Sequence, residues 1–136
     1  MSIDARHHLT VPSDRSSISL LDPFLRSHGI STLAGDRYHD VLVAVTEAVN
    51  NAIVHGNSND PSKPVLIDIQ CSEGEIIAVI RDSGRGFDPD SIPDPRLPEN
   101  LLREGGRGVF LIRHLADSVE FSRSNDGNAV FIKFFV

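Results

Sequence analysis

The longest periodic pattern in the chain runs from Asp36 to about His55, where apolar residues recur at helical spacing. The apolar positions of this segment are Leu42, Val45, Val49, Ala52 and Ile53. Gly56 and Asn57 follow directly, and residues of these types commonly end helices. The pattern predicts a long amphipathic helix that packs on a core.

Shorter segments predict strands around that helix. Residues 5–14 have strand-like content and end at a Pro-Ser-Asp break. Residues 64–84 predict a β-hairpin that turns around Glu73 and Gly74, and residues 118–136 predict a second one that turns between Asn125 and Asn128. Residues 13–30 and 108–117 have helical spacing, with Pro23 kinking or offsetting the first of these helices.

The segment from Gly84 to Gly106 has no periodicity and is expected to form a loop. Four prolines interrupt it, at positions 89, 93, 95 and 98. A loop of this length in a compact domain is usually functional or mobile. We therefore expect residues from about Asp88 to Glu104 to act as a mobile lid.

Composition narrows the class of protein. The chain has 136 residues, 40% of them hydrophobic and 24% charged, which fits one soluble domain over residues 1–136. The formal net charge of -6 disfavours direct binding of DNA or RNA. No apolar run is long enough to cross a membrane, and the N-terminus lacks the apolar core of a secretory signal, so we expect a cytoplasmic protein. The single cysteine, Cys71, excludes an intramolecular disulfide and an all-cysteine metal site.

Polar residues interrupt the long helix in the stretch "TEAVNNAIVHGN". Glu47 and Asn51 are four residues apart, with His55 four further on, so they share a face away from the apolar stripe. This face is either solvated or built for a ligand. Two adjacent asparagines, Asn50 and Asn51, are poor helix formers, which favours a ligand.

Two glycine-containing segments add candidate chemistry. "RDSGRGFDP" follows a strand that is expected to end at Ile80, and it is either a common turn or a place where Gly84 and Gly86 admit a ligand to the backbone. Asp82 offers an acceptor that can orient an exocyclic amine.

The second segment, "EGGRGVFLI", leads directly into a helix. It is either a flexible hinge or an anion site made of free backbone N–H groups at a helix N-terminus.

The order of these three segments resembles the N box and the two glycine boxes of the GHKL ATPase superfamily, and within it the chain is similar to the anti-sigma-factor serine kinases. "TEAVNNAIVHG" and "REGGRGVFLI" are close to the sequences typical of that family. The resemblance covers nearly the whole chain. It implies the Bergerat fold, an α/β two-layer sandwich in which helices cover one face of a mixed, mostly antiparallel sheet.

The resemblance also assigns roles on the long helix and at the first glycine box. It implies that Asn51 holds Mg²⁺ together with the phosphates of ATP and that Glu47 accepts a proton from an attacking hydroxyl. Asp82 would bind the adenine amine, with Gly84 and Gly86 beside it, and Asn50 would be a neighbour of the pocket.

The second glycine box and the last hairpin complete the implied site. Gly105, Gly106 and Gly108 would surround the phosphates, with charge supplied by Arg103 or Arg107. One position departs from the family pattern: many relatives have Ser or Thr after the glycine of the last hairpin, where this chain has Asn128. We expect Asn128 to take over that place beside adenine.

The implied function is an anti-sigma factor with ATP-dependent serine kinase activity. Its partners would be a sigma factor and a small STAS-type anti-anti-sigma protein that it phosphorylates, and the acidic net charge suits a basic, DNA-binding client. We expect a homodimer. The alternative is a partner-switching module that binds ATP without transferring phosphate; a stand-alone ATPase is a weaker third reading.

Overall fold

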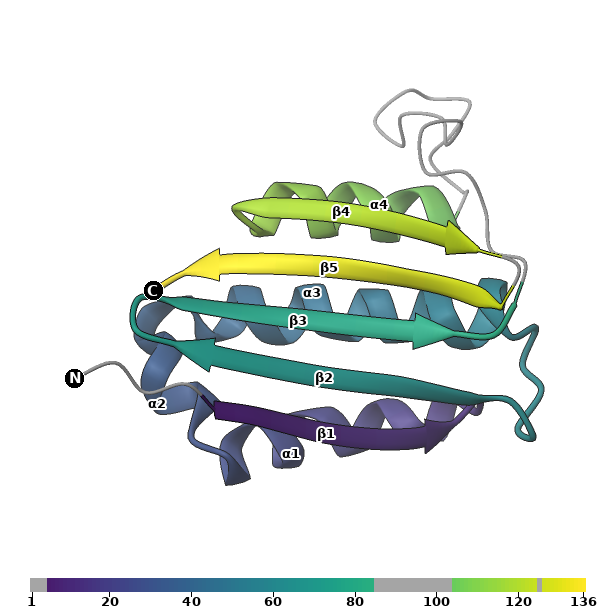
Figure 1. Ribbon diagram of the computed structural model, residues 1–136, viewed down its shortest axis with the longest axis horizontal. Helices are drawn as coiled ribbons and strands as arrows, with labels where there is room; N and C mark the ends of the chain where they lie inside the picture. The colour runs from purple at the N-terminus through teal and green to yellow at the C-terminus, as the bar shows by residue number, and fades with distance from the viewer. Residues whose placement is uncertain (1–4, 85–103, 125) are drawn as a thin grey trace.

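The computed structural model describes residues 5–84, 104–124 and 126–136. Five strands form one sheet in the order β1-β2-β3-β5-β4, and all four pairings between neighbouring strands are antiparallel. The helices of the described chain lie together on one face of this sheet, so the molecule has two layers (Figure 1). The predicted two-layer α/β sandwich is confirmed, and no parallel pairing occurs among the described strands.

Both predicted hairpins are present. The strands are β1 (Ala5–Pro12), β2 (Pro64–Ser72), β3 (Glu75–Asp82), β4 (Ser118–Ser124) and β5 (Gly127–Phe135). Gly74 turns the first hairpin with a φ of +84°, a left-handed conformation that favours glycine. Two boundaries differ from the sequence prediction. β3 continues past Ile80 to Asp82, and Asn128 lies inside β5, because Asp82 and Asn128 pair across the two strands.

The helical layer contains both α-helices and tighter or wider turns. It consists of a 3₁₀ turn (Arg15–Leu20), α1 (Leu21–Ser27), α2 (Ile30–Ala34), a 3₁₀ turn (Gly35–Arg37), α3 (Tyr38–Asn51), a π-helical turn (Ala52–Gly56) and α4 (Glu104–Leu115). The change from 3₁₀ to α-helix just before Pro23 is the predicted offset. The long predicted helix is present but widens to a π turn at Ala52, whose carbonyl accepts from the Asn57 N–H at 2.8 Å. Such turns are frequent at functional sites.

α4 begins earlier than predicted. Its first residue is Glu104, so Gly105, Gly106 and Gly108 lie within the helix rather than in a loop before it. The first-turn N–H groups of a helix have no intrahelical acceptor, so a glycine-rich first turn can still present donors to an anion.

The core lies between the sheet and the helices. Alternation along β2 buries Val65, Ile67, Ile69 and Cys71 on the helical side. Facing them, the apolar stripe of α3 is buried, with Val45, Val49 and Ile53 fully inaccessible. Each fully buried side chain of this size contributes about 1.5–3 kcal/mol of transfer free energy. This packing fixes where the polar face of α3 can point.

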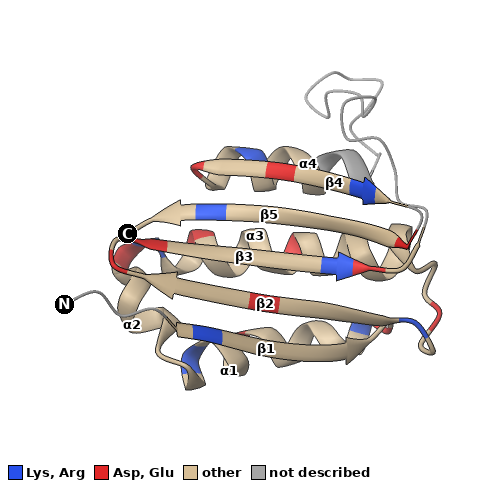
Figure 2. Ribbon diagram, viewed as in Figure 1, with Lys and Arg blue, Asp and Glu red and all other residues tan. Residues whose placement is uncertain are grey.

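The charged residues do not form a single-sign surface along the strands. Figure 2 shows basic and acidic positions interspersed over the sheet. In the described part of the chain, no helix combines the length and apolar character needed to cross a membrane.

Candidate functional site

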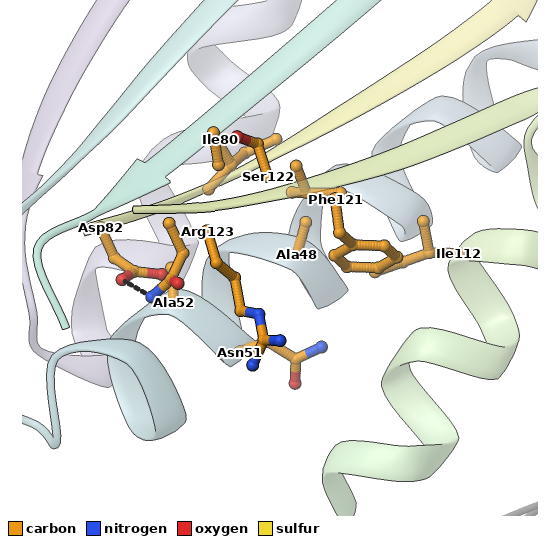
Figure 3. Close-up of a pocket in the computed structure, with 12 residues that line it drawn as sticks. Ala48, Asn51, Ala52, Ile80, Asp82, Ile112, Phe121, Ser122 and Arg123 are labelled. Atoms are coloured by element: carbon orange, nitrogen blue, oxygen red, sulfur yellow. Dashed lines mark hydrogen bonds between the residues drawn. The ribbon is translucent and has the colours of Figure 1, made fainter. Parts of the chain in front are cut away.

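A pocket lies between the end of α3 and the edge of the sheet where β3 ends, β5 begins and β4 ends. The pocket is partly open to solvent, and Figure 3 shows the side chains around it. The described residues that line it are Ala48, Asn51, Ala52, Ile80, Asp82, Ile112, Phe121, Ser122, Arg123, Asn128, Ala129 and Val130. The apolar members could contact the faces of a flat ring, and the polar members lie at its margin. The structure therefore brings Asn51, Asp82 and Asn128 to one cavity.

Asp82 is held in a fixed orientation at the end of β3. Its Oδ1 accepts from the Gly84 N–H at 2.9 Å and from Asn128 Nδ2 at 2.8 Å. Because both of these bonds use Oδ1, the second carboxylate oxygen has capacity to accept from a ligand amine. This geometry suits the hydrogen bond from an adenine amine that the sequence predicts for Asp82.

Asn128 contacts Asp82 from the neighbouring strand. Its Nδ2 also donates to the Gly84 carbonyl at 2.9 Å, so one amide group joins β5 to the turn after β3. The other end of the amide, Oδ1, is buried and has no hydrogen-bond partner among the described residues. An unpaired buried acceptor costs about 1–3 kcal/mol, and such groups often mark functional positions.

Two glycines allow the segment after α3 to contact the turn after β3. A Cβ added at Gly84 would collide with the backbone carbonyl of Gly56, and one added at Gly56 would collide with the Asp82 carboxylate. Close contact with the protein's own backbone is therefore one reason for a glycine at position 84, beside the turn and the ligand access that the sequence leaves open.

The side chain of Asn57 adds hydrogen bonds beside this contact. The sequence predicted Asn57 only as a residue that ends the helix. Its side chain is completely buried; Nδ2 donates to Ser13 Oγ at 2.9 Å and to the Lys63 carbonyl at 3.1 Å. Its Oδ1 accepts from the Ser83 N–H at 2.9 Å. The Asn57 amide thus joins the residue after β1, the residue before β2 and the residue after β3, close to Asp82. A polar residue directly after a helix-ending glycine is the only sequence signal for it.

Glu47 and Asn51 lie against Gly108 of α4. A Cβ added to Gly108 would lie 3.0 Å from Asn51 Nδ2, 3.1 Å from Asn51 Oδ1 and 3.1 Å from Glu47 Oε2. Asn51 is buried, whereas Glu47 is half-buried. The predicted pair is therefore brought together on one face of α3, while His55, within the π turn, is exposed.

The donor set at this end of α3 fits Mg²⁺. Amide and carboxylate oxygens are the hard ligands that Mg²⁺ prefers, and it usually takes only one or two protein ligands together with phosphates and water. The described residues contain no group of three or more His, Cys, Asp or Glu that could hold a metal ion, at this site or at any other, so phosphates and water would have to supply most of the ligands. Asn51 is the residue that would hold the ion, with Glu47 beside it.

The remaining predicted site residues are Asn50, Gly86, Arg103, Gly105, Gly106 and Arg107. Gly86 and Arg103 lie outside the described residues, as does the expected lid except for Glu104. Gly105, Gly106 and Arg107 belong to the first turn of α4. Asn50 is half-buried and is not among the residues given above for the pocket lining.

Sequence reasoning missed the apolar lining and one cation. Ala48 and Ala52 come from α3, Ile80 from β3, Phe121 from β4, and Arg123 follows Phe121 by two positions. Strand alternation was the available signal, because residues two apart in a strand share a face.

Comparisons with known proteins agree with this geometry. The model of the histidine kinase-like ATPase domain matches residues 11–134. The chain is 34% identical to the anti-sigma F factor of Clostridium perfringens over 99 residues, covering 69% of each protein. It is 35% identical to the serine-protein kinase RsbW of Staphylococcus aureus over 121 residues, covering 82% of this chain and 75% of the relative.

A solved structure extends the likeness to the fold. The RsbU and RsbW domains of a Mycobacterium tuberculosis protein superpose with a TM-score of 0.60 at 16% identity, covering 96% of this chain and 32% of the solved chain. At that identity the superposition shows the fold alone. The family match, by contrast, spans nearly all of the sequence. The chain belongs to the histidine kinase-like ATPase domain family.

Proposed function

We propose that this protein is an anti-sigma factor that also acts as an ATP-dependent serine kinase. The observation that carries the proposal is the meeting of Glu47, Asn51 and Gly108, of which Asn51 also lines the pocket that holds Asp82. The relatives named anti-sigma F factor and serine-protein kinase RsbW support the same reading. Its partners would be a sigma factor and a small anti-anti-sigma protein, and it would work as a homodimer in the cytoplasm.

Each part of the site has a task in this function. The apolar lining would hold the adenine ring, and Asp82, oriented by Asn128, would accept a hydrogen bond from its amine. Asn51 would hold Mg²⁺, which neutralises phosphate charge when bound. Gly105 and Gly106 would present backbone N–H groups of the first turn of α4 to the phosphates.

Glu47 would orient the serine hydroxyl of the partner and take its proton. It lies one helical turn before Asn51, so a hydroxyl that reaches the terminal phosphate passes its carboxylate. A positioned base contributes typically about 10²–10⁴-fold to the rate. A module that only binds ATP needs no such base, and this favours the kinase over the binding-module alternative.

The decisive experiment uses γ-labelled ATP, Mg²⁺ and the candidate anti-anti-sigma protein. Wild-type protein should transfer label to the partner. Glu47→Gln should bind nucleotide and partner normally but transfer label roughly 10²–10⁴-fold more slowly. Normal single-turnover transfer by Glu47→Gln would refute the base role. Binding of ATP without any transfer by the wild type would establish the partner-switching module, and release of free phosphate alone would establish an ATPase.

A further inference from the structure

The neighbouring strands β3, β5 and β4 each have a polar residue at the same end of the sheet. Asp82 of β3 pairs in register with Asn128 of β5, and Asn128 pairs with Arg123 of β4. One step further into the sheet, the residues on the same face are apolar: Ile80, Val130 and Phe121. The face that packs against the helices therefore ends in a row of three polar residues, defined here as the Asp82–Asn128–Arg123 row.

Arg123 is an unusual residue for that face. It continues the alternation of Val119 and Phe121, both of which pack against the core. Its side chain reaches from β4 into the pocket, toward the side where Asn51 lies (Figure 3). Among the described residues, Arg123 has no hydrogen bond or ion pair. Arg123 is exposed at the end of this face, so its guanidinium is accessible to an anionic ligand that enters the pocket.

A second arginine of the same sheet shows the difference. Arg81 lies between Ile80 and Asp82 on β3, so its side chain is on the opposite face of the sheet from theirs. Its guanidinium lies 5.7 Å from the centre of the Phe131 ring. Arg81 therefore has a cation–π partner on the face away from the helices. Arg123 differs from Arg81 in the face of the sheet on which it lies and in the residues around it.

The spacing of the row matches the length of a nucleotide. Arg123 lies two strands from Asp82, which places their backbones about 10 Å apart across the sheet. A ligand whose amine binds Asp82 would thus carry its sugar and first phosphate toward β4. Asn51, the proposed metal residue, lines the same pocket, so both side chains would face the phosphate part of the ligand.

We propose that Arg123 is a nucleotide-binding residue that donates to the phosphate nearest the ribose. The inference rests on the proposed function, because it takes an adenine nucleotide as the occupant of the pocket. The planar guanidinium offers paired N–H donors that match phosphate oxygens, and such charge-assisted bonds are stronger than neutral ones. In a chain of net charge -6, a local cation also offsets the repulsion of a polyanionic ligand.

The test compares adenosine, AMP and ADP by calorimetry on three proteins: wild type, Arg123→Gln and the control Arg81→Gln. Arg123→Gln should bind AMP and ADP about tenfold or more weakly, as expected for loss of a charge-assisted bond, with adenosine affinity unchanged. Arg81→Gln should match the wild type for all three ligands. Arg123→Lys should retain part of the AMP affinity, because it keeps the charge without the planar fork.

The outcomes separate this inference from the proposed function. Unchanged affinity of Arg123→Gln for AMP would overturn it, and so would an equal loss for adenosine and AMP, since the phosphate would then not be the contact. Thermal melting of the free variants shows whether they remain folded. If the wild type bound no adenine nucleotide at all, the proposed function itself would fail.

Discussion

The two ends of the helix pair α3 and α4 differ in how fully their polar groups are hydrogen-bonded within the protein. At the end where α3 begins, Arg37 donates to Asp117 at 2.6 Å and to the carbonyls of Leu115 at 2.7 Å and Phe135 at 3.1 Å. Asp117 in turn accepts from the Phe135 N–H at 2.7 Å. This end, defined here as the Arg37 clamp, pairs its polar groups within the protein.

The pocket end leaves polar capacity unused. Asn128 Oδ1 is buried without a partner among the described residues, and Asp82 uses one oxygen for both of its hydrogen bonds given above. Unsatisfied groups reduce stability, whereas bonded ones contribute to it. The contrast favours a stabilising role for the clamp, and it agrees with our proposal that the pocket end binds a ligand.

The largest expected effect comes from Gly108→Ala, which alters only the pocket end. The added Cβ would lie 3.0–3.1 Å from Asn51 and Glu47, so these side chains must shift by a few tenths of an ångström. Small displacements of reacting groups reduce rates by up to about 100-fold. Helix propensity favours Ala over Gly by about 1 kcal/mol, so stability should not fall. Transfer assays and urea unfolding measure both quantities; full activity would contradict the assigned geometry.

Asn128→Asp should have the next largest effect. It replaces the donor to Asp82 and Gly84 with a carboxylate of the same size, which places two like charges in contact. We expect a loss of about 1.5–3 kcal/mol in unfolding free energy at neutral pH, together with weaker nucleotide binding. Lowering the pH should relieve the repulsion and recover part of the stability. Stability equal to wild type at neutral pH would show that the amide does not orient Asp82.

Arg37→Ala should affect the other end alone. It removes the hydrogen bonds to Asp117, Leu115 and Phe135, and we expect a loss of about 1–2 kcal/mol in unfolding free energy. Nucleotide affinity should remain within about twofold of wild type, because the clamp lies at the far end of α4 from Gly108. Urea unfolding and calorimetry on the same samples test this separation. A large loss of nucleotide affinity would show that the two ends are coupled.

The smallest effect concerns Tyr38 in the clamp region. Burial and the hydrogen bond from its hydroxyl to Asp22 at 2.6 Å raise the pKa of Tyr38 to about 12. An unfolded tyrosine titrates near 10, so the unfolded chain releases this proton first as the pH rises. The contribution of the raised Tyr38 pKa to the free energy of unfolding is therefore fully present below pH 10 and is lost between about pH 10 and pH 12. Tyr38→Phe should lack this part of the slope; identical slopes in pH-dependent unfolding would exclude the effect.

The sequence predicted the order of the elements because their signals are local. Helical periodicity located α3, and β-rich segments located both hairpins. The sequence prediction placed two element boundaries wrongly, because β3 extends to Asp82 and α4 begins at Glu104. Strand pairing and helix packing determine where these elements end.

Within the site, the sequence predicted which groups one element brings together, and it held no signal for contacts between elements. Glu47 and Asn51 share a helical face and were paired correctly. The buried contacts of Asn57, the reason for Gly84 and the inward position of Arg123 depend on strand register and on packing across the chain. No local pattern carries that information.

The most direct measurement of the central claim is the calorimetric affinity for Mg-ATP of wild type, Asp82→Asn and Asp68→Asn. Asp68 is a matched control, because it lies on β2 and is bound to His8 at 2.9 Å, away from the pocket. Asp82→Asn would present an amide donor to the adenine amine, so affinity should fall about tenfold or more while Asp68→Asn stays at the wild-type value. Equal affinity of all three proteins would contradict the assignment of the pocket end to the nucleotide.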